Sequence, residues 1–242
     1  MADMPRNGKD RWSRKSTVCS AADIGALKAS AEDFRYLLDR GYPRAASLEL
    51  VGNRYTMDRI FRQILHRGVF AARMCELRNA HREHPERIRG EALAVDGYNV
   101  LITVEASMSG IPVLLCDDGW VRDVAGASGG YRFGLMGIRA MAMILAALRG
   151  LGPGRVLFLF DSPMARSGEL ASLFRKEMER YNLAGEALAV PVPEKILLTH
   201  DGPVATSDSA LIDRLSRVVD LAGHIIRCNA ECGELLSLSG TP

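Results

Sequence analysis

Leu93-Ala-Val-Asp-Gly-Tyr-Asn99 is the segment of the chain that most clearly indicates its fold. It begins as a short apolar run and ends at Asp96-Gly97, a pair typical of the end of a buried strand. Two further apolar runs, Val156–Phe160 and Pro203–Ala205, are also followed by an aspartate, directly or after two hydroxyl residues. This repeated pattern predicts a sheet whose strands end in acids.

Strands and helices alternate over the last 150 or so residues. The predicted strands are Leu93–Val95, Val113–Cys116, Val156–Phe160, Lys195–Leu198, Pro203–Ala205 and His224–Arg227, and the predicted helices are Phe133–Leu148, Ser167–Asn182 and Ser209–Leu221. Alternation of this kind favours an α/β fold with a central, mostly parallel sheet covered on both faces.

The first third of the chain differs from the rest in charge and periodicity. Residues 1–90 hold 18 Lys and Arg against 11 Asp and Glu, whereas residues 91–242 hold 13 against 18, so a part of +7 precedes a part of −5. Ser30-Ala-Glu-Asp33 pairs a capping residue with an acid three positions later, ahead of a helical pattern. We expect a flexible basic arm over residues 1–19, a small all-helical domain over 20–88 and an α/β domain over 89–242.

Composition excludes several classes of protein. Hydrophobic residues make up 48% and charged residues 25% of 242, which argues against a disordered chain, a collagen or a coiled coil. The most apolar run, Gly134–Leu148, contains Arg139 and is shorter than a membrane span. The first 17 residues lack the apolar centre of a signal peptide. Five scattered cysteines favour free thiols, so we expect a cytoplasmic protein with no membrane contact.

The acids that follow the predicted strands are the strongest indication of chemistry. Ligands bind at the carboxyl ends of strands in open α/β sheets, so Asp96, Asp161 and Asp208 are expected at one edge. Three carboxylates there repel one another unless a cation lies between them, and oxygen ligands suit Mg²⁺ or Mn²⁺. Such an ion supports phosphoryl chemistry. Each acid alone also has an ordinary explanation, as a turn residue or a helix cap.

Two motifs resemble a known superfamily. Ala94-Val-Asp-Gly-Tyr-Asn99 and Val204–Ile212 resemble the opening and the later strand-to-helix motifs of PIN-like nucleases, especially their NYN branch. Residues 25–240 as a whole resemble an uncharacterised, mainly prokaryotic and archaeal family that joins a small helical domain of unknown function to a PIN-like domain; Glu32–Pro43 and Val51–Tyr55 carry the likeness in the first domain. The resemblance implies a three-layer PIN-like fold and an RNA partner.

The resemblance also implies roles for particular residues. Asp96 and Asp208 become metal ligands, directly or through water, and Asp161 becomes the middle acid. Asn99 is expected to orient the first aspartate or to contact a phosphate. Many PIN-like nucleases have a further acid on the helix after the first strand; Glu105 is the candidate here, only nine residues after Asp96, and Asp213 is an alternative.

Other polar residues are candidates for contact with nucleic acid or for support of the site. Those beside the acids or on the turn after Cys116 are Ser162, Thr206, Ser207 and Arg122. Those on the helical domain, where Arg59 and Arg62 share a helix face, are Arg54, Arg59 and Arg62.

These features favour a metal-dependent, ribonuclease-like hydrolase that cleaves RNA phosphodiester bonds at the aspartate cluster. A non-catalytic RNA- or protein-binding module with the same fold is the first alternative. A haloacid-dehalogenase-type phosphatase is the second; its usual second aspartate, two residues after the first, is replaced here by Tyr98. A homodimer is compatible with the sequence.

Overall fold

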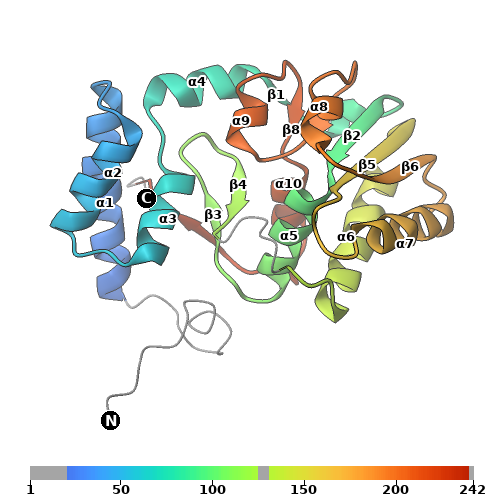
Figure 1. Cartoon of the computed structure of the whole chain (residues 1–242), viewed down its shortest axis with the longest axis horizontal. Coiled ribbons are helices and arrows are strands. Elements are labelled where there is room, and N and C mark those ends of the chain that lie inside the picture. Colours follow the sequence, from blue (N-terminus) through green and yellow to red (C-terminus); the bar gives the residue numbers. More distant parts are fainter. Residues whose placement is uncertain (1–20, 125–130, 240–242) are drawn as a thin grey trace, which may run out of the picture.

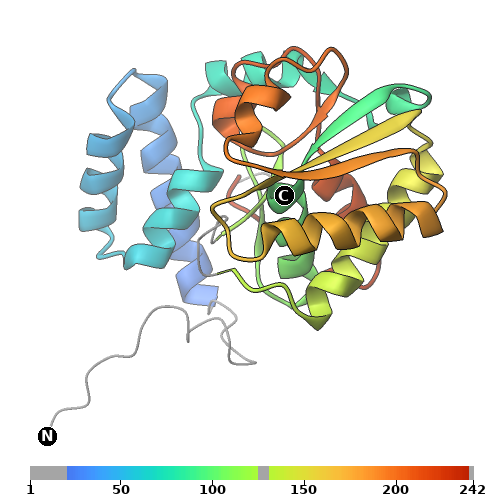
Figure 2. The same cartoon turned by 45° about the vertical axis from the view of Figure 1, so that its right-hand side comes forward.

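The structure is a computed structural model that describes residues 21–124 and 131–239. The expected basic arm, residues 1–19, lies outside the described residues. The first third of the described chain is helical, as predicted, and Figures 1 and 2 show its first three helices at one end of the molecule. Its helices are α1 (Ala21–Asp39), α2 (Arg44–Arg54), α3 (Arg59–Gly68) and α4 (Ala72–Ala80). The Asp58 carboxylate caps α3 by accepting hydrogen bonds from two backbone N–H groups of its first turn, both at 3.0 Å.

A six-stranded sheet forms the centre of the second unit, and every pair of neighbouring strands in it is parallel. Its order is β1-β8-β7-β2-β5-β6. The strands are β1 (Arg82–Glu83), β8 (Val218–Val219), β7 (Val204–Ala205), β2 (Ala92–Asp96), β5 (Arg155–Asp161) and β6 (Gly185–Val190). The predicted mixed α/β architecture with a mostly parallel sheet is therefore confirmed.

Helices cover both faces of this sheet (Figure 2). Leu93 and Val95 of β2 point to the face under α5 (Gly97–Met108), α6 (Leu135–Leu151), α7 (Ser167–Arg180) and α10 (Leu221–Cys228). Ala94, between them, points to the opposite face, under α8 (Pro193–Leu197) and α9 (Ser209–Ile212). This alternation is that of a strand buried on both sides.

A second, three-stranded sheet joins the helical unit to the rest. It consists of β4 (Val121–Asp123), β3 (Val113–Leu115) and β9 (Leu235–Ser237), and a 3₁₀ turn, η2 (Pro85–Ile88), precedes β2. Leu27, Phe34 and Ile64 of the helices share one buried cluster with Leu114 of β3 and Leu238 after β9. The helical unit therefore packs its core directly on this sheet.

Three predicted elements were wrong. Lys195–Leu198 and His224–Arg227 were expected to be strands but lie in α8 and α10. Short apolar runs do not distinguish a strand from a buried helical turn; Pro193 starts the first helix, and the Asp220 carboxylate caps the second by accepting from the Gly223 N–H at 3.0 Å. The predicted helix Ser209–Leu221 ends at Ile212, and β8 follows it.

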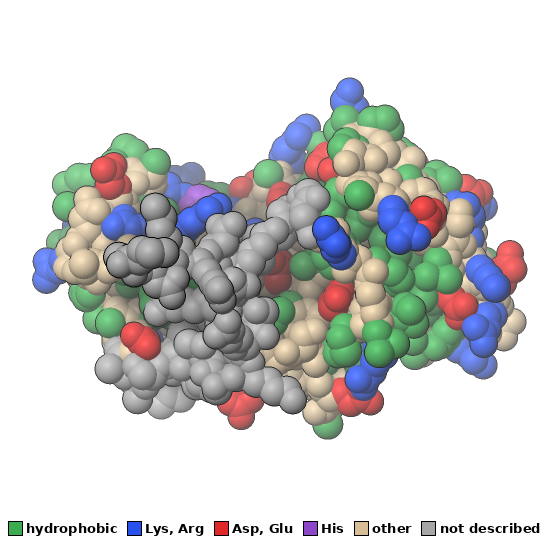
Figure 3. All heavy atoms as spheres, turned by 60° about the horizontal axis from the view of Figure 1, so that its bottom comes forward, with side chains coloured by type: hydrophobic (Ala, Val, Ile, Leu, Met, Phe, Trp, Pro, Cys, Tyr) green, Lys and Arg blue, Asp and Glu red, His purple; other side chains and the backbone are tan. Residues whose placement is uncertain are grey.

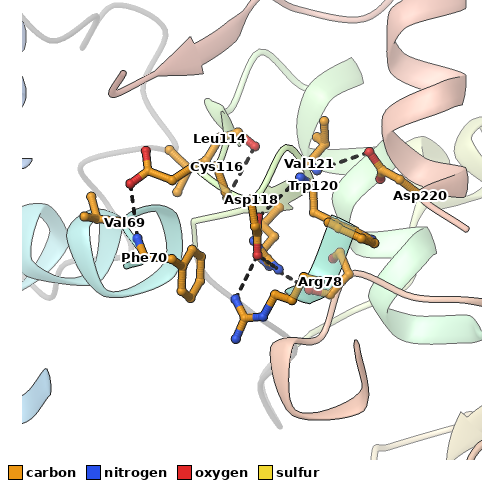
Figure 4. A network of polar contacts seen from close by, with 12 residues as sticks. Val69, Phe70, Arg78, Leu114, Cys116, Asp118, Trp120, Val121 and Asp220 are labelled. Atoms are coloured by element: carbon orange, nitrogen blue, oxygen red, sulfur yellow. Dashed lines mark hydrogen bonds and ion pairs between the residues drawn. The ribbon is translucent and has the colours of Figure 1, made fainter. Parts of the chain in front are cut away.

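A buried charge network fixes the β3–β4 hairpin between the two units (Figure 4). Asp118, fully buried in the turn, accepts hydrogen bonds at 2.8 Å from Arg122 of β4 and from Arg78 of α4. The Arg78 guanidinium also lies over the Phe70 ring and donates to Asp213 at 2.6 Å. Asp118 thus ties the hairpin directly to α4, and Arg78 links both to the segment that carries Asp213.

No helix in the described ranges is long and apolar enough to cross a bilayer. The four cysteines within them, Cys75, Cys116, Cys228 and Cys232, are free thiols, as expected.

The Asp118→Asn substitution is expected to lower the free energy of unfolding by about 3 kcal/mol, because it leaves two buried guanidinium groups without their shared carboxylate. Urea unfolding followed by circular dichroism measures this. Asp201→Asn, at an exposed position, is the matched control and is expected to change stability by less than about 0.5 kcal/mol. Equal stability of the two variants would contradict the role of the network.

Candidate functional site

The three aspartates follow three neighbouring parallel strands. Asp96 ends β2 and lies opposite Leu159 of β5, two residues before Asp161 at the end of that strand. Asp208 comes three residues after β7, which pairs with β2 on its other side. All three acids therefore belong to the carboxyl edge of the sheet. Their roles as ligands stay predictions.

Glycine at position 97 allows the helix after β2 to start directly beside β5. A Cβ there would lie 2.5 Å from a ring carbon of Phe160 and 2.8 Å from the Leu159 carbonyl oxygen. No turn separates the strand from α5, although Asp-Gly pairs often form one. The close packing of glycine against β5 holds Asp96 at the N-terminus of a helix, where the helix dipole favours negative charge.

A chain of hydrogen bonds joins Asp96 to the segment that carries Asp208. The Thr206 hydroxyl donates to Asp96 Oδ2 at 2.9 Å and accepts from the Asp208 N–H at 3.1 Å. The Asn99 side-chain oxygen accepts from the N–H and the hydroxyl of Ser207, at 2.8 and 3.0 Å. Both hydroxyl residues are buried. Asn99 therefore uses its side chain to fix this segment rather than to orient Asp96.

Desolvation dominates the electrostatics of Asp96 and raises the pKa of its carboxyl to about 7. The Thr206 hydroxyl and the nearby Asn99 N–H oppose this rise, while the negative charges of Asp208 and Glu194 add to it. Burial and Glu194 likewise raise the pKa of Asp161. The charges of Asp208 and Glu194 therefore disfavour ionisation of Asp96, and that of Glu194 disfavours ionisation of Asp161.

Glu194 is the acid that the sequence reasoning missed. It lies exposed in the first turn of α8, which follows β6, the neighbour of β5. The sequence does contain a pattern that points to Glu194: the apolar stretch from β6 through Pro191-Val-Pro193 ends at this acid. Glu194 was not predicted because Ala187–Val190 was not identified as a strand.

Glu105 does not lie with these acids. It is nine residues along α5 from Asp96, a separation of roughly 13 Å in a helix. Its carboxylate accepts a hydrogen bond from the Tyr131 hydroxyl, and burial raises its pKa. The structure therefore contradicts its predicted place as a fourth ligand. Asp213, the alternative, accepts from Arg78 and belongs to the buried network.

Arg122 is not available for a phosphate. It is 2% exposed, and besides its two bonds to Asp118 it donates to the Ser207 carbonyl oxygen at 2.6 Å. The Arg122 guanidinium therefore holds the segment before Asp208 from the buried side, through the Ser207 carbonyl. Ser162 is exposed directly after Asp161, and its carbonyl accepts from the Ser167 hydroxyl at 3.3 Å.

The arginines expected to form a phosphate-binding face on the helical unit are partly engaged elsewhere. Arg62 donates to the Met57 carbonyl and to the Asn53 side chain, at 3.0 and 2.9 Å, and its phosphate contact stays a prediction. Arg54 pairs with Asp33 at 3.4 Å but stays largely exposed. Arg59 is exposed at the start of α3.

Comparison with known proteins places both units in families. The domain of unknown function DUF5616 matches residues 85–224, which include the four acids, and the protein of unknown function DUF434 matches residues 26–81. The chain belongs to the DUF5616 family. An uncharacterized protein of Methanocaldococcus jannaschii is 30% identical over 203 residues, which cover 83% of this chain and 97% of that protein. No solved structure matches the chain.

The donor set of this DUF5616 site fits a hard divalent cation. All four acids carry oxygen atoms of the kind that such a cation prefers, and besides burial the charges of Asp208 and Glu194 raise the pKa of Asp96. Among the described residues, no three His, Cys, Asp or Glu side chains form a ready-made metal site. A Mg²⁺ ion held here would use one or two of these carboxylates and keep several of its waters.

Without divalent metal, Asp96 makes the stability of the protein depend on pH. The folded protein retains the Asp96 proton up to about pH 7, whereas an unperturbed carboxyl loses it near 3.8, so the folded state is favoured at low pH and this contribution is lost as pH rises through about 7. Relative to wild type, Asp96→Asn is expected to gain on the order of 2 kcal/mol between about pH 5 and about pH 8. Urea unfolding in chelator measures this, with Asp201→Asn as the control. An Asp96→Asn profile parallel to that of wild type would contradict the raised pKa.

Proposed function

We propose that this chain is a Mg²⁺- or Mn²⁺-dependent phosphodiester hydrolase with a PIN-like fold, acting on single-stranded RNA. The observation that carries the proposal is the group of carboxylates after β2, β5, β6 and β7, in which burial and like charge together raise the pKa of Asp96. A purely structural role gives no reason to collect mutually repelling acids at one edge of a sheet. The likeness of the Asp96 and Asp208 motifs to the NYN branch supports RNA as the substrate.

Each residue has a distinct part in this proposal. Asp96 and Asp208 hold the cation, directly or through water, with Asp161 and Glu194 adding negative charge around it. The Thr206 hydroxyl fixes one oxygen of Asp96. A bound Mg²⁺ or Mn²⁺ supplies Lewis acidity and neutralises the charge that develops on a phosphate. The unprotonated carboxylates are also placed to accept a proton from an attacking water.

Asp208 also caps a helix, and this determines which substitution removes its charge without disturbing the fold. One oxygen of its carboxylate caps α9 by accepting from the N–H groups of Ala210 and Leu211, at 2.8 and 3.1 Å. Asparagine also caps helices well, so Asp208→Asn removes the charge and keeps the cap.

A non-catalytic RNA-binding module is the second candidate. The observation in its favour is that the acids within the described residues form no ready-made metal site. RNA binding that persists without any turnover in Mg²⁺ or Mn²⁺ would select it.

In Mn²⁺, wild-type protein is expected to cleave single-stranded RNA, and Asp96→Asn and Asp208→Asn are expected to lower the rate about 100-fold or more, because each removes a charge that holds the cation. Gel electrophoresis of end-labelled RNA gives the rates, and Asp201→Asn is the control with an unchanged rate. Undiminished cleavage by Asp208→Asn, or none by wild type, would refute the proposal.

Glu194→Gln is expected to weaken Mn²⁺ binding about tenfold and to leave the fold intact, because the side chain is exposed and acts through its charge alone. Isothermal titration with MnCl₂ measures the affinity. Glu179→Gln, at an exposed position on α7, is the matched control. Equal affinities for the two variants would remove Glu194 from the site.

A further inference from the structure

A pocket of about 730 Å³ opens beside the acid edge. One wall comes from Tyr98, two residues after Asp96, and another from the stretch Ala165–Leu173, which begins four residues after Asp161. The two segments that carry the acids therefore continue directly into the pocket walls. The Tyr98 phenol also lies close enough to Asp161 for that carboxylate, together with burial, to raise its pKa.

The lining of this pocket is aromatic and apolar, with charged side chains at its margin. Tyr98, Tyr131 and Phe133 supply three rings, and Arg132 and Arg166 are exposed beside them. Arg166 donates to Glu169, which also lines the pocket, at 2.6 Å. On the face seen in Figure 3, hydrophobic side chains gather over the part of the molecule that carries α6 and α7, with arginines and acids around them. The volume lies in the range typical of small-ligand sites.

Tyr131 is held firmly in this wall. Its hydroxyl donates to Glu105, and its ring meets Tyr98 edge-on, with centroids 5.8 Å apart and planes at 77°. Tyr98 in turn packs edge-on against Phe160 of β5 at 5.3 Å. A ring fixed on two sides loses little freedom when a flat ligand stacks on it. This gives Glu105, excluded from the acid group, a different use: it positions the aromatic wall.

We propose that this pocket binds one unpaired base of an RNA strand whose neighbouring phosphate lies at the acid edge. Bases stack on aromatic side chains, and arginines bind the backbone that joins them. An apolar peptide side chain would contact the rings but would make no use of the exposed Arg132 or of the adjoining acids. The inference rests on the proposed function for the identity of the strand, but not on its turnover.

Binding of labelled single-stranded RNA, measured by fluorescence anisotropy in chelator, tests the pocket apart from cleavage. Tyr131→Leu is expected to weaken binding about tenfold, whereas Tyr131→Phe, which keeps the ring and loses the bond to Glu105, stays within about threefold of wild type. Arg132→Gln is expected to reduce the salt dependence of binding, and Arg149→Gln, an exposed arginine in the last turn of α6, is its matched control.

A set of RNAs with one abasic nucleotide at successive positions sharpens the test. Wild type is expected to lose affinity at one position, and Tyr131→Leu to lose this position dependence. Equal binding by wild type and Tyr131→Leu, position-independent abasic effects, or no RNA binding by wild type would each overturn the base pocket. Absence of Mn²⁺-dependent cleavage with these binding effects intact would instead overturn only the hydrolase, so the two failures are distinguishable.

Discussion

The buried carboxylate of Asp118 joins the helical unit to the α/β unit. It pairs with Arg78 from the helical unit and with Arg122 from the β3–β4 hairpin, all three side chains being almost fully buried. Arg122 continues to the carbonyl of Ser207, and Arg78 to Asp213, so both ends of the short segment that carries Asp208 and α9 are tied to the same carboxylate. Because one buried charge without its partner costs several kcal/mol, this arrangement holds or fails as a whole.

This network attaches the helical unit to the α/β unit. Residues 26–81 and 85–224 match two separate families, yet their cores meet on the three-stranded sheet and their charges meet at Asp118. A phosphate-binding role for Arg62 is correspondingly weakened, since its guanidinium holds α2 to α3. Part of the positive charge in the first third of the chain is thus engaged in hydrogen bonds and ion pairs within the protein.

Of the central sheet, β2, β5 and β7 were predictable because each is a short apolar run with a clear end, whereas β1, β6 and β8 were not predicted. The order of β7, β2 and β5 within the sheet was not predictable from the sequence, because the pairing of distant strands and its register are set by tertiary packing. The strand predicted over Lys195–Leu198 was wrong because its three apolar residues are too few to show a period. For the site, Asp96, Asp161 and Asp208 could be named from their positions after strands, whereas Glu194 required β6, and Glu105 required knowing that Tyr131 lies beside it.

The acid edge and the aromatic pocket are two consequences of a single local geometry. Gly97 lets α5 start against β5, which places Asp96 at the helix N-terminus and Tyr98, the second residue of the helix, beside Phe160. A carboxylate in this position is poorly solvated, so near neutral pH it is neutralised either by a proton or by a cation. An RNA phosphate brought to the edge adds further negative charge, which disfavours the bare carboxylates and increases the advantage of the cation. A base held in the adjoining pocket would therefore couple strand binding to cation binding through electrostatics alone, without any change in the fold.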